Sequence, residues 1–259
     1  MIMDSTIKQL LQLPNTWQAR HQPRQDAAYP SGFSDLDKNL HLGGWPAAAT
    51  TELLLSKPGY GELPLLLPTL RQRQHQSRWF AMIDPPFTPY APTLQALGID
   101  LERLLLIYPK NLKDLIWSSV QCLQSEHCSS VLTWGTHAVL DNKQLRRLQQ
   151  AATVGQSWFV LMRPQQAQHH SSPSALRMTL SPAANSLTVR ILKQRGGWSG
   201  QKLQLNTAHE TPTAANMERP VYLSQLPQHP SENDAKASRQ GLSRVLPLKS
   251  KLRAHAAPE

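Results

Sequence analysis

The residues whose types and order suggest chemistry lie in a loop between a strand and a helix. Residues 50–55 (Thr-Thr-Glu-Leu-Leu-Leu) read as a short strand, residues 56–61 (Ser-Lys-Pro-Gly-Tyr-Gly) as a loop, and a leucine-rich helix is expected from about Glu62 to Gln74. This is the order of a phosphate-binding loop. Such a loop needs terminal glycines, inward backbone N–H groups, a lysine for the phosphates and a hydroxyl for magnesium.

The decisive positions of that motif carry other residue types. When Gly61 is aligned with the last glycine, Ser56 takes the first glycine position, Glu62 the lysine position and Leu63 the hydroxyl position. A carboxylate repels phosphate, and an isobutyl group gives magnesium no ligand. We therefore predict a degenerate loop that holds no cofactor. Its residues are Ser56, Lys57, Gly59, Gly61 and Glu62.

Within this loop, Glu62 is expected to pair with the helix dipole and Lys57 to be a solvated charge. Residual phosphate affinity stays open, because helix N-termini favour anions. Trp134 stands where a magnesium-orienting aspartate would end the fourth strand, and Asp84 is the one acid left after the second strand. A lone carboxylate there is typical of a turn. We predict no enzyme, no catalytic residues and no metal site, with a weak ATPase as the remaining alternative.

Apolar periodicity predicts the elements that carry this loop. Further strands are expected at residues 78–83, 104–108, 130–134 and 158–162, where Arg163-Pro164 stops the last one. Helices are expected at residues 90–97, 111–124 and 144–152. Residues 176–180 and 187–192 alternate apolar and polar residues, as a β-hairpin would. The predicted fold is α/β, with a parallel sheet, helices on both faces and a C-terminal hairpin.

The run from Tyr29 to Pro164 resembles the core of the RecA/RadA recombinases. The matching stretches are Ser31–Asp37, Gly43–Pro46, Thr51–Leu54 and Leu97–Leu104. Within that superfamily the chain is similar to the ImuA/SulA family. That closer match rests on Gly61–Pro68, Ser77–Trp79, Pro85–Pro92, Leu145–Gln149, Arg163–Pro164 and Leu192–Gly197. Residues 47–50 (Ala-Ala-Ala-Thr) depart from the family, which usually has a glycine there, so a shifted turn is expected.

The resemblance implies binding rather than catalysis. On the ImuA side it implies an SOS-induced mutasome adaptor. Its partners would be a polymerase-like subunit of the ImuB type, an error-prone replicative-type DNA polymerase and RecA. The alternative is a SulA-type inhibitor that binds the cell-division polymer. The lead-in at residues 31–46 and the long extension after the hairpin favour ImuA, because SulA lacks both.

Three segments are expected: an N-terminal helix and linker (1–29), a RecA-like core with its hairpin (30–205) and a disordered partner-binding tail (206–259). The tail composition cannot bury enough apolar surface to offset its ordering entropy. Its apolar clusters read either as a docking peptide or as a solvated linker. The candidate partner-binding residues are Leu223, Leu226, Leu242, Val245, Leu246, Leu248 and Arg253.

The net charge of +10 suits an acidic partner, either nucleic acid or a protein surface. Weak DNA contact is expected near the hairpin, although charge also commonly blunts a sheet edge, and Trp198 there either stacks on a base or packs back on the hairpin. The candidate nucleic-acid residues are Arg190, Lys193, Arg195, Trp198 and Lys202. Two cysteines, no leader pattern and no apolar run long enough for a membrane span predict a soluble cytoplasmic protein.

Overall fold

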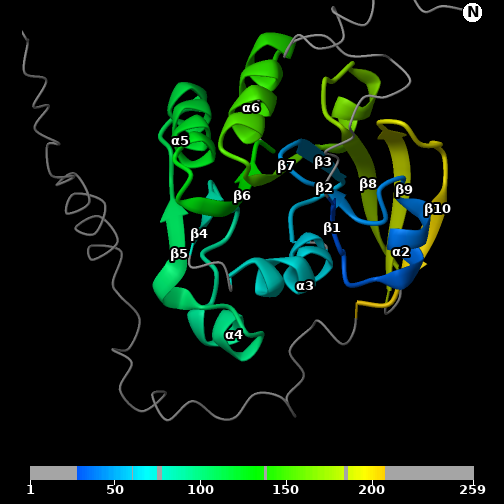
Figure 1. The fold of residues 1–259 in the computed structure, drawn as a ribbon, viewed down its shortest axis with the longest axis horizontal. Helices are drawn as coiled ribbons and strands as arrows, with labels where there is room; N and C mark the ends of the chain where they lie inside the picture. The colour runs from blue at the N-terminus through cyan, green and yellow to red at the C-terminus, as the bar shows by residue number, and fades with distance from the viewer. Residues whose placement is uncertain (1–27, 60, 75–77, 137–138, 184–185, 208–259) are drawn as a thin grey trace, which may run out of the picture. The chain divides into compact units, whose positions relative to one another are not determined.

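A mixed β-sheet forms the centre of the computed structural model, which describes residues 28–207 apart from 60, 75–77, 137–138 and 184–185. In chain order its strands are β3 (Thr50–Leu55), β4 (Trp79–Ile83), β5 (Leu104–Ile107), β6 (Cys128–Trp134), β7 (Trp158–Pro164), β8 (Leu176–Ala183), β9 (Ser186–Gln194) and β10 (Lys202–Leu205). Their order across the sheet is β10-β9-β8-β3-β7-β6-β4-β5 (Figure 1). The predicted N-terminal helix and the predicted tail lie outside the described residues.

Helices cover both faces of this sheet, which confirms the predicted fold class. On one face lie α2 (Ser34–Asn39), α3 (Glu62–Gln74) and α4 (Ala91–Ala96), and on the other lie α5 (Leu112–Gln124) and α6 (Asn142–Val154) (Figure 1). Short 3-10 turns occur at Leu101–Arg103 (η1) and Gln165–His169 (η2). Every residue of β3 is buried, as expected for a strand covered on both sides. The loop after β3 therefore extends from the interior of the sheet.

Local capping explains where the helices start and stop. The Asn111 side chain accepts the Asp114 N–H at 3.0 Å at the start of α5. At the start of α6, Asp141 and Gln144 form a reciprocal capping box. Gly98 follows α4 with a φ of 80°, a conformation that suits glycine and ends the helix.

Two features of the strands differ from the sequence-based expectations. Arg163 and Pro164 do not stop β7 but belong to it, because Leu54 and Leu55 of β3 pair with them. The predicted hairpin of β8 and β9 is present, and it is continuous with the main sheet, since β8 pairs in parallel with β3. The sequence reading also missed β10, which pairs with β9 and forms one edge of the sheet.

A lead-in before β3 closes the face that α3 covers. The strands β1 (Ala28–Tyr29) and β2 (Trp45–Pro46) pair with each other. Trp45 is fully buried against Trp158, and its indole N–H donates to Thr69 Oγ1 at 3.0 Å. The buried Arg73 guanidinium lies 3.8 Å from the centre of the Tyr29 ring. The lead-in is thus part of the core, and β1 lies at the end of the segment 1–29 that was expected as a helix and linker.

Candidate functional site

The loop after β3 is closed by its own carboxylate. Glu62, the first residue of α3, is almost fully buried, and its Oε1 accepts the Gly59 N–H at 2.7 Å. A backbone N–H of this loop is the kind of donor that would otherwise face a phosphate. Glu62 therefore does more than sit at the helix start as a dipole partner, because it supplies an internal anion to the loop.

The two residues aligned above with the phosphate-site lysine and the strand-end acid contact each other. Trp134 is buried at the end of β6, and its indole N–H donates to Glu62 Oε1 at 3.4 Å. A lysine and an aspartate at these positions would bridge nucleotide and magnesium. Here a neutral indole and a carboxylate share a hydrogen bond inside the protein.

The other loop residues have the exposure and backbone conformation expected for their types. Ser56 and Lys57 are exposed, in agreement with the reading of Lys57 as a solvated charge. Gly59 and Gly61 have φ values of 84° and 100°. A Cβ at Gly59 would lie 3.3 Å from Phe87, and one at Gly61 would lie 3.0 Å from Leu187, so apolar side chains crowd both glycines.

Asp84, the candidate acid after the second strand, has the left-handed backbone of a turn. Its φ is 55°, and its N–H donates to the Ile107 carbonyl at 2.8 Å. An aspartate tolerates this conformation better than most residues. Asp84 thus takes the turn role that the sequence favoured.

The reading from sequence missed a buried ionic cluster on β3. Glu52 is completely buried, and its Oε2 accepts from Arg177 Nε at 2.9 Å and from Arg163 Nη1 at 3.4 Å. Its Oε1 accepts from the hydroxyl groups of Ser172 and Ser174. The only signal in the sequence was a carboxylate within a strand that carries no other charge.

The cluster keeps Glu52 charged. Burial raises the pKa of Glu52, but the hydrogen bonds from Ser172 and Ser174 and the two guanidinium groups outweigh burial and lower the pKa below 4.5. Glu52 and Arg177 are direct register partners on β3 and β8, so the cluster joins the hairpin to the parallel core.

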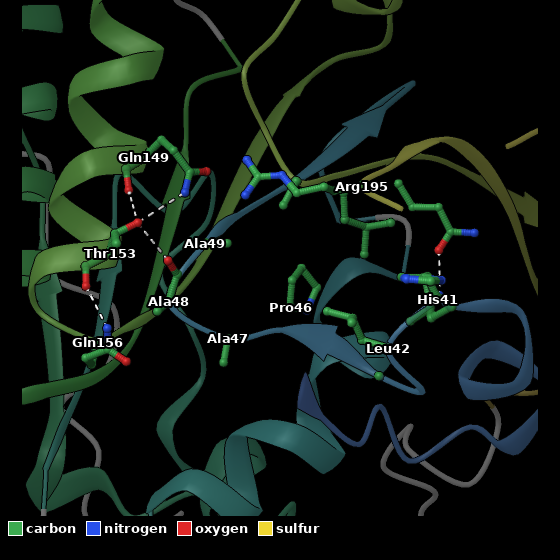
Figure 2. A pocket seen from close by; sticks show the side chains of 15 residues that line it. His41, Leu42, Pro46, Ala47, Ala48, Ala49, Gln149, Thr153, Gln156 and Arg195 are labelled. Carbon is green, nitrogen blue, oxygen red and sulfur yellow. Dashed lines mark hydrogen bonds between the residues drawn. The ribbon is translucent and has the colours of Figure 1, made fainter. Parts of the chain in front are cut away.

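A cavity of about 560 Å³ lies near the amino end of β3, away from the degenerate loop. Its floor is the turn at residues 46–49, where Ala48 has a φ of 50° and its carbonyl accepts from Thr153 at 3.0 Å (Figure 2). The departure from a glycine noted in the sequence thus places an alanine in a left-handed turn. Arg195 reaches over this cavity toward Gln149 (Figure 2).

The structure gathers the candidate nucleic-acid residues along β9 and β10. Arg190 and Lys202 are register partners and both are exposed. Lys193 donates to the Ser172 carbonyl at 2.7 Å. Trp198, in the turn between the two strands, is 86% exposed, so the expectation that it packs back onto the hairpin is wrong.

The candidate partner-binding residues of the tail lie outside the described residues. No group of three or more His, Cys, Asp or Glu side chains that could hold a metal ion occurs within the described ranges. In the same part of the chain, none of the helices combines the length and the apolar character needed to cross a membrane.

Comparison with known proteins identifies the family of this chain. A family model described as cell division inhibitor SulA matches residues 51–159. The cell division inhibitor SulA of Edwardsiella piscicida is 34% identical over 117 residues, which cover 43% of this chain and 68% of that protein. That of Cronobacter turicensis is 30% identical over 126 residues, which cover 46% and 74%. The chain belongs to the SulA family.

The match to SulA covers only part of this chain and only part of its relatives. The SulA of Pectobacterium atrosepticum is 30% identical over 103 residues, so the chain spans about three fifths of that relative's length (61%). The matched residues of the family model run from β3 into β7 and include the degenerate loop. The lead-in, the strands β8 to β10 and the tail fall outside that model.

Proposed function

We propose that this SulA-family member is a non-catalytic, cytoplasmic protein that inhibits cell division during the DNA-damage response by binding the division polymer. The single observation that supports a binding role is the Glu62 carboxylate on the Gly59 N–H. It fills the loop with a fixed negative charge, in place of the lysine that nucleotide hydrolysis needs. The relatives' name, cell division inhibitor, supports the choice of process.

The surface proposed to bind the polymer is the β5 end of the sheet, which lies within the matched residues. Leu105 on β5 is 38% exposed, Tyr108 just after it is 52% exposed, and Trp117 on α5 is 59% exposed. β5 is also an edge strand with one side unpaired within the described sheet. Exposed aromatic residues near a strand edge are typical of protein-binding surfaces.

The test is induced expression with measurement of cell length, together with light scattering of the purified division polymer. Intact protein should lengthen cells and reduce polymer assembly. Trp117→Ala should weaken both effects by about tenfold or more, because aromatic anchors dominate such interfaces. Trp198→Ala is the matched control, since it removes an even more exposed indole from the turn after β9. Normal cell length on expression of the intact protein would overturn the proposal.

A second candidate is an ImuA-type adaptor that assembles an error-prone polymerase complex. The observation that favours it is the fold outside the matched residues: the lead-in buries Trp45 in the core, and β8 to β10 extend the sheet. In this reading the segment after Asn206 holds a polymerase-like subunit of the ImuB type, with the replicative-type polymerase and RecA as further partners.

Truncation after Asn206 separates the two candidates. An inhibitor should still block division without the tail, whereas an adaptor should lose its polymerase-like partner in a pull-down from damaged cells. A nucleotide assay tests the shared premise. ATP hydrolysis well above background that Glu62→Ala or Asp84→Ala abolishes would contradict both candidates, because each assumes a loop without catalysis.

A further inference from the structure

A long stretch of the chain carries positive charge without any acidic residue. Between Asp141 and Glu210 there is no aspartate or glutamate. The basic residues of this stretch are Lys143, Arg146, Arg147, Arg163, Arg177, Arg190, Lys193, Arg195 and Lys202. It includes α6 and the strands β7 to β10, and four of its cations lie on or next to the end pair β9 and β10: Arg190, Lys193, Arg195 and Lys202.

Strand register places three of these cations on one face. Side chains alternate along a strand, and Leu187, Val189 and Ile191 of β9 belong to the buried core on the side of α3. Arg190 therefore points to the opposite face, as does its cross-strand partner Lys202. The register between β8 and β9 shifts between Arg177 and Met178. Beyond that shift Lys193 pairs with Arg177, so Lys193 lies on the same face as Arg190. Arg195 follows the end of β9 and lies close enough to Lys193 to lower the pKa of that lysine, so it extends this row of cations.

In the described part of the chain, no acidic side chain forms an ion pair with any of these four cations. Glu52 is the nearest carboxylate, and it is buried and already paired with Arg163 and Arg177. Burial lowers the pKa of Lys193, and the cations of Arg177 and Arg195 lower it further, against the opposing effect of Glu52. Among the described residues, no hydrogen bond or ion pair engages the side chains of Arg190, Arg195 or Lys202. The face is thus a row of mutually repelling charges that an external polyanion would neutralise.

An exposed aromatic and a cavity lie at the end of this row. Trp198 follows Arg195 by three residues, and its ring is 86% exposed. Its carbonyl accepts from Gln194, which fixes the turn that carries the ring. The cavity under Arg195 has otherwise neutral or histidine lining residues, so the cation is its one strong electrostatic feature. A flat exposed indole beside cations distinguishes this surface from one built only for acidic protein.

We propose that the face formed by Arg190, Lys193, Arg195 and Lys202, with Trp198 at its end, binds single-stranded nucleic acid. The four cations contact phosphates, and the Trp198 ring stacks on a base. The binding is independent of base sequence, because these groups recognise the backbone and the π-face of any base. It is separate from the division polymer surface, which lies at the other end of the sheet.

The experiment is fluorescence anisotropy of a labelled 20-residue oligo(dT) with the full-length protein at several salt concentrations. Four phosphate contacts predict a slope of log affinity against log salt of about −3. The double variant Arg190→Ala/Lys202→Ala should halve that slope and weaken binding about tenfold. Its matched control is Lys110→Ala/Lys113→Ala, which removes the same charge from exposed positions at the β5 end.

Stacking is tested separately. Trp198→Ala should weaken binding about tenfold, and Trp198→Phe should restore most of it. The proposal is overturned if the Arg190/Lys202 and Lys110/Lys113 double variants lose equal affinity, which would indicate net charge alone. It is also overturned if a polyglutamate peptide binds while oligo(dT) does not, which would assign the face to an acidic protein. Thermal unfolding of each variant confirms that the fold is intact.

Discussion

Replacing Glu52 with glutamine removes one charge from the buried cluster while keeping the size of the side chain. Arg163 and Arg177, which are 2% and 6% exposed, then share the interior without a counter-ion. Removing one partner of a buried ion pair costs about 3–5 kcal/mol, because the remaining charge stays desolvated. A domain of this size has a free energy of unfolding of about 5–15 kcal/mol, so Glu52→Gln should remove a large part of it.

The lowered pKa of Glu52 determines how its contribution to the free energy of unfolding changes with pH. Because the pKa of Glu52 is lowered from 4.5 in the folded protein, its charge stabilises the fold fully above about pH 4.5. That contribution is lost as the pH falls through the lowered folded value. The difference in unfolding free energy between wild type and Glu52→Gln should therefore be constant near neutral pH and shrink in acid.

Urea denaturation followed by circular dichroism, repeated from neutral pH downward, measures this difference. The matched control is Arg103→Gln, which breaks the half-exposed ion pair of Arg103 with Asp100 (3.4 Å). Its cost should stay below about 1 kcal/mol, as for other surface pairs. A loss below about 1 kcal/mol for Glu52→Gln, or a difference that persists unchanged in acid, would refute the reasoning.

Three further substitutions probe the packing and are measured by the same denaturation. Ala48→Gly should stabilise the fold by about 1 kcal/mol, because glycine adopts a φ of 50° without the clash of a Cβ; an unchanged midpoint would argue against strain in this turn. Gly155→Ala should destabilise by about 3 kcal/mol, since the new Cβ would lie 1.7 Å from the Leu123 carbonyl oxygen. Trp45→Phe should cost about 1–3 kcal/mol by leaving Thr69 without its indole donor; a neutral result would show that the hydrogen bond is readily replaced.

The elements of the parallel core followed from the sequence because their causes are local. Apolar runs of strand length and helices with one apolar face gave β3 to β7 and α3 to α6 nearly to their ends. The short strands β1, β2 and β10 were missed, because a strand of two to four residues has too little pattern of its own.

The ionic cluster could not be derived, because it depends on register between distant segments. Glu52 and Arg177 pair across β3 and β8, and Arg163 comes from β7. Arg163 next to a proline read as the end of a strand, although its guanidinium is buried in the cluster. In the loop, the residue types alone predicted that the phosphate-binding lysine and the magnesium-binding hydroxyl are missing. That Glu62 would bind both Gly59 and Trp134 required the three-dimensional arrangement.

The two proposed surfaces lie at opposite ends of one continuous sheet. Seven strand spacings separate β5 from β10, which at about 4.8 Å each amounts to roughly 34 Å. The Glu52 cluster ties β8, and through it β9 and β10, to the core that matches SulA. The strands outside the match are therefore built into the same body as the matched residues. A partner on β5 leaves the face of Arg190 and Lys202 open, so one molecule can hold a protein and a nucleic-acid strand at once.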